Sequence, residues 1–121
     1  MKVIYVSGKY RADTPEGVDE NIAKARAVAI NLWKSGWAVI CPHMNTAKMN
    51  IDSDIILDGD IEILSRCDAV YMLDGWWESE GAVKEFMYAE KHDMDILQAP
   101  ESIDRMNKLL GVVENNEGIV A

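Results

Sequence analysis

The sequence lacks the features that mark several large classes of protein. It contains only two cysteines, Cys41 and Cys67. Their separation fits no metal or redox motif, so we expect reduced thiols packed beside apolar segments. No apolar run approaches the roughly 20 residues that a transmembrane helix needs. The apolar run at the N-terminus is too short for a signal peptide and ends at Ser7-Gly8. We therefore expect a cytoplasmic protein with no membrane partner.

Basic residues are also scarce, with 12 Lys and Arg against 21 Asp and Glu and a net charge of −9. This balance argues against a nucleic acid polymer as partner, because such binding depends on basic surfaces that neutralise phosphates. It does not exclude a small phosphorylated ligand, which needs only one local group of donors. No cluster of ligating side chains predicts a metal site, and we expect no cofactor.

The chain does contain an alternation of two patterns within 121 residues that are 49% hydrophobic. Short apolar runs alternate with segments in which apolar residues recur every three or four positions, as strands alternate with helices. Thr14 is expected to cap the first helix. The strands are expected at residues 2–8, 37–42, 68–75 and 95–100, and the helices at 15–34, from 52 or 53 to 66, at 79–92 and at 102–110. We expect residues 1–121 to form one α/β domain with a parallel sheet between two layers of helices.

In such sheets, ligands bind beyond the carboxyl ends of the strands. This rule selects the segments Ser7 to Arg11, Pro42 to Thr46 and Asp74 to Gly81. In the first of them, Gly8 would let backbone amides approach an anion, to which Lys9 and Arg11 add charge. The same residues also fit a tight strand exit with two solvated bases.

Two carboxylates stand out from the surface charges. Glu85 shares its helix face with small or aromatic residues, within the first two turns of a helix whose N-terminus favours an anion. Asp60 has Ile56, Leu57, Ile63 and Leu64 as its neighbours one turn away, so an acid sits on an apolar face. A buried carboxylate is costly unless it is paired, and where it is tolerated it often has a function. The alternatives are a cap, a buried hydrogen bond or a dimer contact.

Four segments in this order resemble the nucleoside 2-deoxyribosyltransferase superfamily, which includes the 2′-deoxynucleoside 5′-monophosphate N-hydrolases. They are "IYVSGKYR", "DGDIEIL", "CDAVYMLDG" and "SEGAVKEFMYA", and the resemblance covers roughly the first 95 residues. It implies a flavodoxin-like three-layer sandwich with a small parallel sheet of four to five strands. It also implies a homodimer or higher homo-oligomer, in which a neighbouring subunit can complete the site, and cleavage of an N-glycosidic bond by a glutamate nucleophile.

The resemblance assigns roles to individual residues. Glu85 matches the nucleophile, four residues after the motif glycine Gly81. Asp60 matches the aspartate that positions and helps to protonate the departing base. Tyr5 matches a first-strand tyrosine that contacts the catalytic carboxylate or the sugar. Gly8 and Arg11 match the loop that lines the 5′ end of the ligand. Ser7 and Lys9 beside them are also expected to bind the substrate, although the family pattern does not require Lys9.

Ser79, six residues before Glu85, stands where nucleoside transferases of this superfamily carry an aspartate and nucleotide hydrolases a phosphate-binding serine. A serine hydroxyl can donate to a phosphate that a carboxylate would repel. His43 points into the expected site region without a defined role. Trp77, in place of a more polar loop, is expected to stack on a base or to belong to a lid or subunit interface.

The sequence therefore predicts hydrolysis of the N-glycosidic bond of a nucleoside 5′-monophosphate, with a 2′-deoxy sugar expected. The products are the free base and the sugar 5-phosphate. Three alternatives stay open: a deoxyribosyltransferase that exchanges bases, a non-catalytic nucleotide sensor, and an interaction subunit whose acids only cap and pair.

Overall fold

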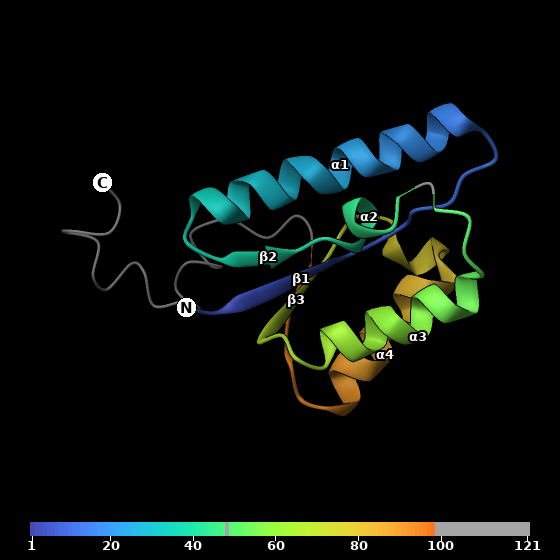
Figure 1. Ribbon diagram of the computed structural model, residues 1–121. Helices are drawn as coiled ribbons and strands as arrows, with labels where there is room; N and C mark the ends of the chain where they lie inside the picture. The colour runs from blue at the N-terminus through green and yellow to red at the C-terminus, as the bar shows by residue number, and fades with distance from the viewer. Residues whose placement is uncertain (48, 99–121) are drawn as a thin grey trace.

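Figure 1 shows the computed structural model of the chain, which describes residues 1–47 and 49–98. Strands and helices alternate as the sequence predicts. The elements are β1 (Val3–Ser7), α1 (Pro15–Lys34), β2 (Ala38–Ile40), α2 (Pro42–Asn45), α3 (Ser53–Leu64), β3 (Ala69–Met72), the 3₁₀ helix η1 (Trp76–Glu78), α4 (Glu80–Lys91) and β4 (Asp95–Gln98). The helix expected at 102–110 lies outside the described residues.

The four strands form one parallel sheet in the order β2-β1-β3-β4. This is the strand order of flavodoxin-like sheets, so the predicted α/β fold is confirmed. The first strand lies in the interior of the sheet, between β2 and β3. Because the strands are parallel, the loops that follow β1, β2 and β3 all leave from one edge of the sheet.

Helices cover both faces of the sheet, with α1 on one side and α3 and α4 on the other (Figure 1). Successive side chains of a strand point to opposite faces. Ile4 and Val6 of β1 accordingly pack in the core beneath α1, whereas Tyr5 packs in the core beneath α3 and α4. A strand buried on both faces explains why β1 has a continuous apolar run instead of an alternating one.

Local caps fix where the long helices begin. The Thr14 side chain accepts a hydrogen bond from the Gly17 amide at 3.0 Å, as predicted, and Pro15 takes the first helical position. Asp52, one of the two expected caps of α3, accepts from the Asp54 amide at 2.8 Å. Ser79 caps α4.

Two short elements were not predicted. The strand expected at 37–42 ends at Ile40, because Pro42 cannot donate to the ladder and opens the short helix α2. A turn at Gly75, whose φ is +80°, leads into η1. Both elements lie at the carboxyl edge of the sheet.

Cys41 and Cys67 are free thiols, the first buried and the second partly buried. Within residues 1–47 and 49–98, no helix is long and apolar enough to cross a membrane.

Candidate active site

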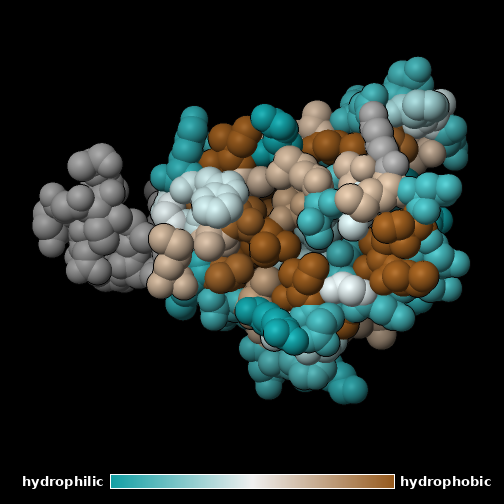
Figure 2. All heavy atoms as spheres, in the orientation of Figure 1, coloured by the Kyte–Doolittle hydropathy of each residue, from teal (hydrophilic) through white to brown (hydrophobic). Residues whose placement is uncertain are grey.

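A cavity of about 570 Å³ opens at the carboxyl edge of the sheet. All three segments selected by the strand-end rule contribute to its lining, and α3 and α4 close it from the other side. Part of its rim is apolar: Met49 and Ile51 line it just before α3. Figure 2 shows apolar residues exposed on the right of the view, where α3 begins. Ile51, just before α3, is 45% exposed, and Ile55, in the first turn of α3 but outside the cavity lining, is 66% exposed.

Glu85 lies at the cavity with only 6% of its surface exposed. The Tyr5 hydroxyl donates a hydrogen bond to its Oε2 atom, and the Ser7 hydroxyl donates to Oε1 at 2.6 Å. Tyr5 and Ser7 are two positions apart on β1, so their side chains share the face that α4 covers. The strand thus places two donors side by side beneath one carboxylate.

Opposing effects act on the pKa of Glu85. Burial raises its pKa to about 7, although the hydrogen bonds from Ser7 and Tyr5 favour the charged form; the negative charge of Asp60 adds to the rise. Burial and the neighbouring carboxylates raise the pKa of Tyr5 far above its usual range. The tyrosine therefore stays a hydrogen-bond donor at physiological pH.

Asp60 lines the same cavity from α3 and is half-buried. Burial raises its pKa to about 6. Within residues 1–47 and 49–98, no hydrogen bond or salt bridge to its carboxylate is made. Two carboxyl groups with raised pKa values thus face one cavity, and one of them is fixed by two donors while the other is not.

The loop after β1 brings Gly8, Lys9 and Arg11 to the cavity. A Cβ atom on Gly8 would lie 2.6 Å from Cδ1 and 2.7 Å from Cβ of Leu73, so close packing against the end of β3 requires glycine there. The Lys9 ammonium lies 3.9 Å from Glu78; the Lys9 side chain is partly exposed and that of Glu78 is exposed.

The start of α4 forms the wall beside this loop. Ser79 lines the cavity, and its Oγ accepts a hydrogen bond from the Ala82 amide at 3.2 Å. Its hydroxyl hydrogen is left to donate elsewhere. Gly81 also lines the cavity, and a Cβ atom there would meet nothing nearer than Leu57 at 3.8 Å. Packing against the rest of the protein therefore does not require glycine at this position.

His43 is buried and lines the cavity from α2. Its Nε2 atom lies 2.9 Å from the Lys9 carbonyl oxygen. Because a carbonyl can only accept, Nε2 carries a hydrogen. Burial lowers the pKa of His43, which favours the neutral ring.

Two predicted ligand-binding residues do not line the cavity. Ser7 is fully buried beneath Glu85, where it donates to the carboxylate. Trp77 is 61% exposed and packs edge-on against Trp76, whose ring stacks on Phe86. Trp76 and Phe86 thus anchor the segment that leads to Ser79, and Trp77 stays outside the cavity.

The model of a domain of unknown function, DUF4406, matches residues 2–98. The chain belongs to this family. Among solved structures, it is similar to a 2-desoxiribosyltransferase from Leishmania mexicana, with a TM-score of 0.59 and 19% sequence identity over 81% of this chain and 63% of that chain. The chain spans less than two thirds of that protein, and the likeness shows a shared fold. No curated protein gives a significant match.

Some lining residues of this DUF4406 domain were not predicted. They come from the connection between α2 and α3 and from the first turns of α3: Met49, Ile51, Ser53, Asp54, Ile56 and Leu57. The strand-end rule marked the start of this segment but stopped where helix α2 ends.

Within the described residues, no group of three or more His, Cys, Asp or Glu side chains is arranged to hold a metal.

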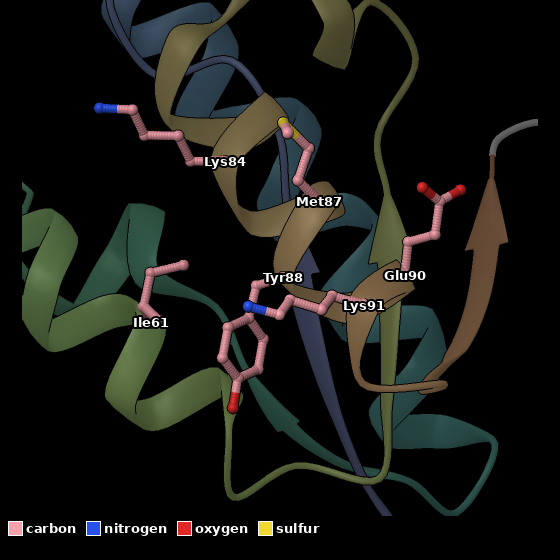
Figure 3. Close-up of a pocket in the computed structure, with 6 residues that line it drawn as sticks. All are labelled: Ile61, Lys84, Met87, Tyr88, Glu90 and Lys91. Carbon is pink, nitrogen blue, oxygen red and sulfur yellow. The ribbon is translucent and has the colours of Figure 1, made fainter.

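A second groove, of about 500 Å³, runs between α3 and α4 of the DUF4406 domain (Figure 3). Ile61 borders it from α3, and Lys84, Met87, Tyr88, Glu90 and Lys91 border it from α4. Neither Glu85 nor Asp60 lines it. The cavity at the sheet edge is therefore the candidate active site.

Proposed function

We propose that this protein cleaves the N-glycosidic bond of a nucleoside 5′-monophosphate through Glu85. The observation that carries the proposal is the buried Glu85 carboxylate, held by Tyr5 and Ser7 at a cavity that Asp60 also lines. The fold shared with a 2-desoxiribosyltransferase supports chemistry at the anomeric carbon. Enzymes that cleave glycosidic bonds usually use two carboxyl groups, to which different surroundings give different roles.

In the first step, a Glu85 oxygen forms an ester bond to C1′ as the bond from C1′ to the base nitrogen breaks. The electron pair of the broken bond goes to the base, which takes a proton from Asp60. Tyr5 and Ser7 fix the carboxylate, whose negative charge stabilises the positive charge that develops at C1′. Water then cleaves the ester and returns a proton to Asp60. The products are the free base and the sugar 5-phosphate.

A monophosphate fits the polar end of the cavity. Arg11 and Lys9 line it, the Ser79 hydroxyl can donate there, and α4 begins beside it with its positive dipole end. Glu78 and Glu80 also line this end, but Lys9 lies 3.9 Å from Glu78 and Lys84 lies 3.7 Å from Glu80. These lysines offset part of the acidic charge that a phosphate would meet.

A base-exchanging deoxyribosyltransferase is the second candidate, since the neighbour in fold carries that name. It would use the same first step, with a second base in place of water as acceptor. A 2′-deoxy sugar is expected in either case, because loss of the 2′-hydroxyl makes the positive charge at C1′ easier to form.

The test is base release from a panel of ribo- and deoxynucleoside 5′-monophosphates and the matching nucleosides, followed by chromatography, with and without a second free base. Glu85→Gln and Glu85→Ala should abolish release, whereas Glu90→Gln, on the exposed side of the same helix, should retain it. Exchange only in the presence of a second base would identify a transferase. If wild type turns over no substrate while a nucleotide stabilises the fold, the protein is a sensor and the enzymatic proposal is wrong. An interaction subunit would show neither response.

A further inference from the structure

The loop after β1 is held by side chains from two other elements. The Lys9 carbonyl oxygen accepts from Nε2 of His43 at 2.9 Å. The next two carbonyl oxygens, of Tyr10 and Arg11, lie 3.1 Å and 3.4 Å from Nδ2 of Asn21 on α1. Three consecutive peptide groups are thus oriented by donors from α2 and α1.

The side chains of Asn21 and His43 can both donate hydrogen bonds to the carbonyl groups of the loop. An asparagine Nδ2 carries two hydrogens, so one amide can serve two neighbouring carbonyls. His43 must carry its hydrogen on Nε2, and its ring also packs edge-on against the Tyr10 ring at 5.8 Å. Within residues 1–47 and 49–98, neither Lys9 nor Arg11 makes a backbone–backbone hydrogen bond. The conformation of this loop therefore depends strongly on Asn21 and His43.

Holding this loop has a consequence for the cavity. Gly8, Lys9, Tyr10 and Arg11 all line it, and the loop supplies two of its positive charges. Asn21 does not line the cavity, so it can act only through the loop. A fixed loop would spare an anionic ligand the entropy of ordering it.

We propose that Asn21 and His43 are positioning residues that hold residues 8–11 against α1 and α2 and so keep Lys9 and Arg11 at the cavity. The effect on substrate rests on the proposed function, whereas the effect on the loop does not. The two can be tested separately.

Asn21→Asp is the sharpest variant. It keeps the shape of the side chain but replaces the amide donor with an oxygen that cannot donate to a carbonyl. Asn31→Asp, the same change at an exposed site later in α1, is the matched control. Asn31 lies near the C-terminus of α1, where the helix dipole makes a negative charge unfavourable. The control should therefore destabilise the helix at least as much as the test variant does.

The rate of trypsin cleavage reports directly on the mobility of the loop, because trypsin cleaves after Lys9 and Arg11. Under native conditions, Asn21→Asp should raise the cleavage rate at these two bonds by roughly three- to tenfold, the range expected for losing one or two hydrogen bonds. Cleavage after Arg26, inside α1, reports general unfolding and should not change. His43→Leu should also speed cleavage of the loop, and His43→Gln, which can still donate an amide hydrogen, should restore part of the protection. If Asn21→Asp is cleaved no faster than Asn31→Asp at these bonds, the proposal is wrong.

The kinetic test uses a 5′-monophosphate and its matching nucleoside. Asn21→Asp should raise KM for the monophosphate several-fold and change kcat less than twofold, with a much smaller effect on the nucleoside. An open loop with an unchanged KM would refute the role in ligand binding. If wild type turns over nothing, the proposed function fails, and the proteolysis still decides whether the two side chains hold the loop.

Discussion

Replacing Glu85 with glutamine should stabilise the protein at alkaline pH and should remove the activity that we propose. Burial raises the pKa of Glu85 from 4.5 to about 7, so the folded state holds the proton more tightly than the unfolded chain does. The stability associated with the protonated carboxyl is complete below about pH 4.5 and is lost as the pH rises through about 7. A shift of about 2.5 units at 1.36 kcal/mol per unit is a cost of about 3 kcal/mol once the group is ionised.

The cost develops mainly between pH 5 and pH 8. Linkage with these two pKa values gives about 1 kcal/mol at pH 5 and about 3 kcal/mol at pH 8, so the advantage of Glu85→Gln should grow by about 2 kcal/mol over this range. The absolute difference will be smaller, since the glutamine amide cannot accept both hydrogen bonds from Tyr5 and Ser7. The growth with pH is the diagnostic quantity.

Urea unfolding measures how the stability difference between Glu85→Gln and wild type changes with pH. The unfolding is followed at fixed protein concentration and several pH values, and the free energy of unfolding is extrapolated to water. Glu90→Gln, on the exposed side of α4, controls for removal of a carboxylate from that helix. A difference between Glu85→Gln and wild type that stays constant from pH 5 to pH 8 would refute the reasoning. It would mean that water or a conformational change relieves the buried charge.

Two further predictions concern the cavity. If Asp60 supplies the proton, kcat/KM of the wild type should pass through a maximum at about pH 6.5, where the two carboxyl groups share one proton. The reactive form has this proton on Asp60 and the charge on Glu85, and it is the less populated of the two arrangements, because the pKa of Glu85 is the higher one. Asp60→Asn should lower kcat/KM by about 10²- to 10⁴-fold and remove the alkaline fall; an unchanged profile in the variant would exclude Asp60 as the acid. The two cavity glycines should separate stability from binding. Gly8→Ala collides with Leu73 and should cost about 1–3 kcal/mol in thermal or urea unfolding, whereas Gly81→Ala should leave stability equal or higher and raise KM. Equal losses of stability in both glycine variants would contradict the observed packing.

Much of the fold could be predicted from the sequence, because its signals are local. Thr14-Pro15 marks the start of a helix by its own hydrogen bond and its fixed φ, and the apolar run of β1 reports burial on both faces. Elements with weaker local signals were missed. The four residues of α2 are too few to show a helical period, and Pro42 was interpreted as the end of a strand when it begins a helix.

The candidate site could be predicted only in part, because its contacts join distant positions. The spacing on one helix singled out Glu85, and the strand-end rule selected the segments that meet at the cavity. The partners of Glu85 are 78 and 80 positions away, and only the family resemblance pointed to one of them, Tyr5. Strand period could have paired Ser7 with Tyr5 on one face, but the position of Ser7 at a strand end suggested a ligand contact instead. Asn21 lies in the middle of an ordinary amphipathic pattern, and nothing in that pattern marks it as the donor to a loop ten residues earlier.

The arrangement around Glu85 explains why the fold tolerates a buried acid. Two hydroxyl donors are too few to keep the carboxylate fully ionised against burial, since its pKa still rises to about 7. They are enough to fix its orientation, because each oxygen receives one of them. A group that serves only structure would be better replaced by an apolar side chain of similar volume, as buried ion pairs often can be. A carboxylate that is fixed, destabilising when charged and open to a cavity is what a reaction through a positive transition state requires. The stability that Glu85→Gln is expected to gain at pH 8 therefore measures a cost that the proposed chemistry accounts for and that packing alone does not.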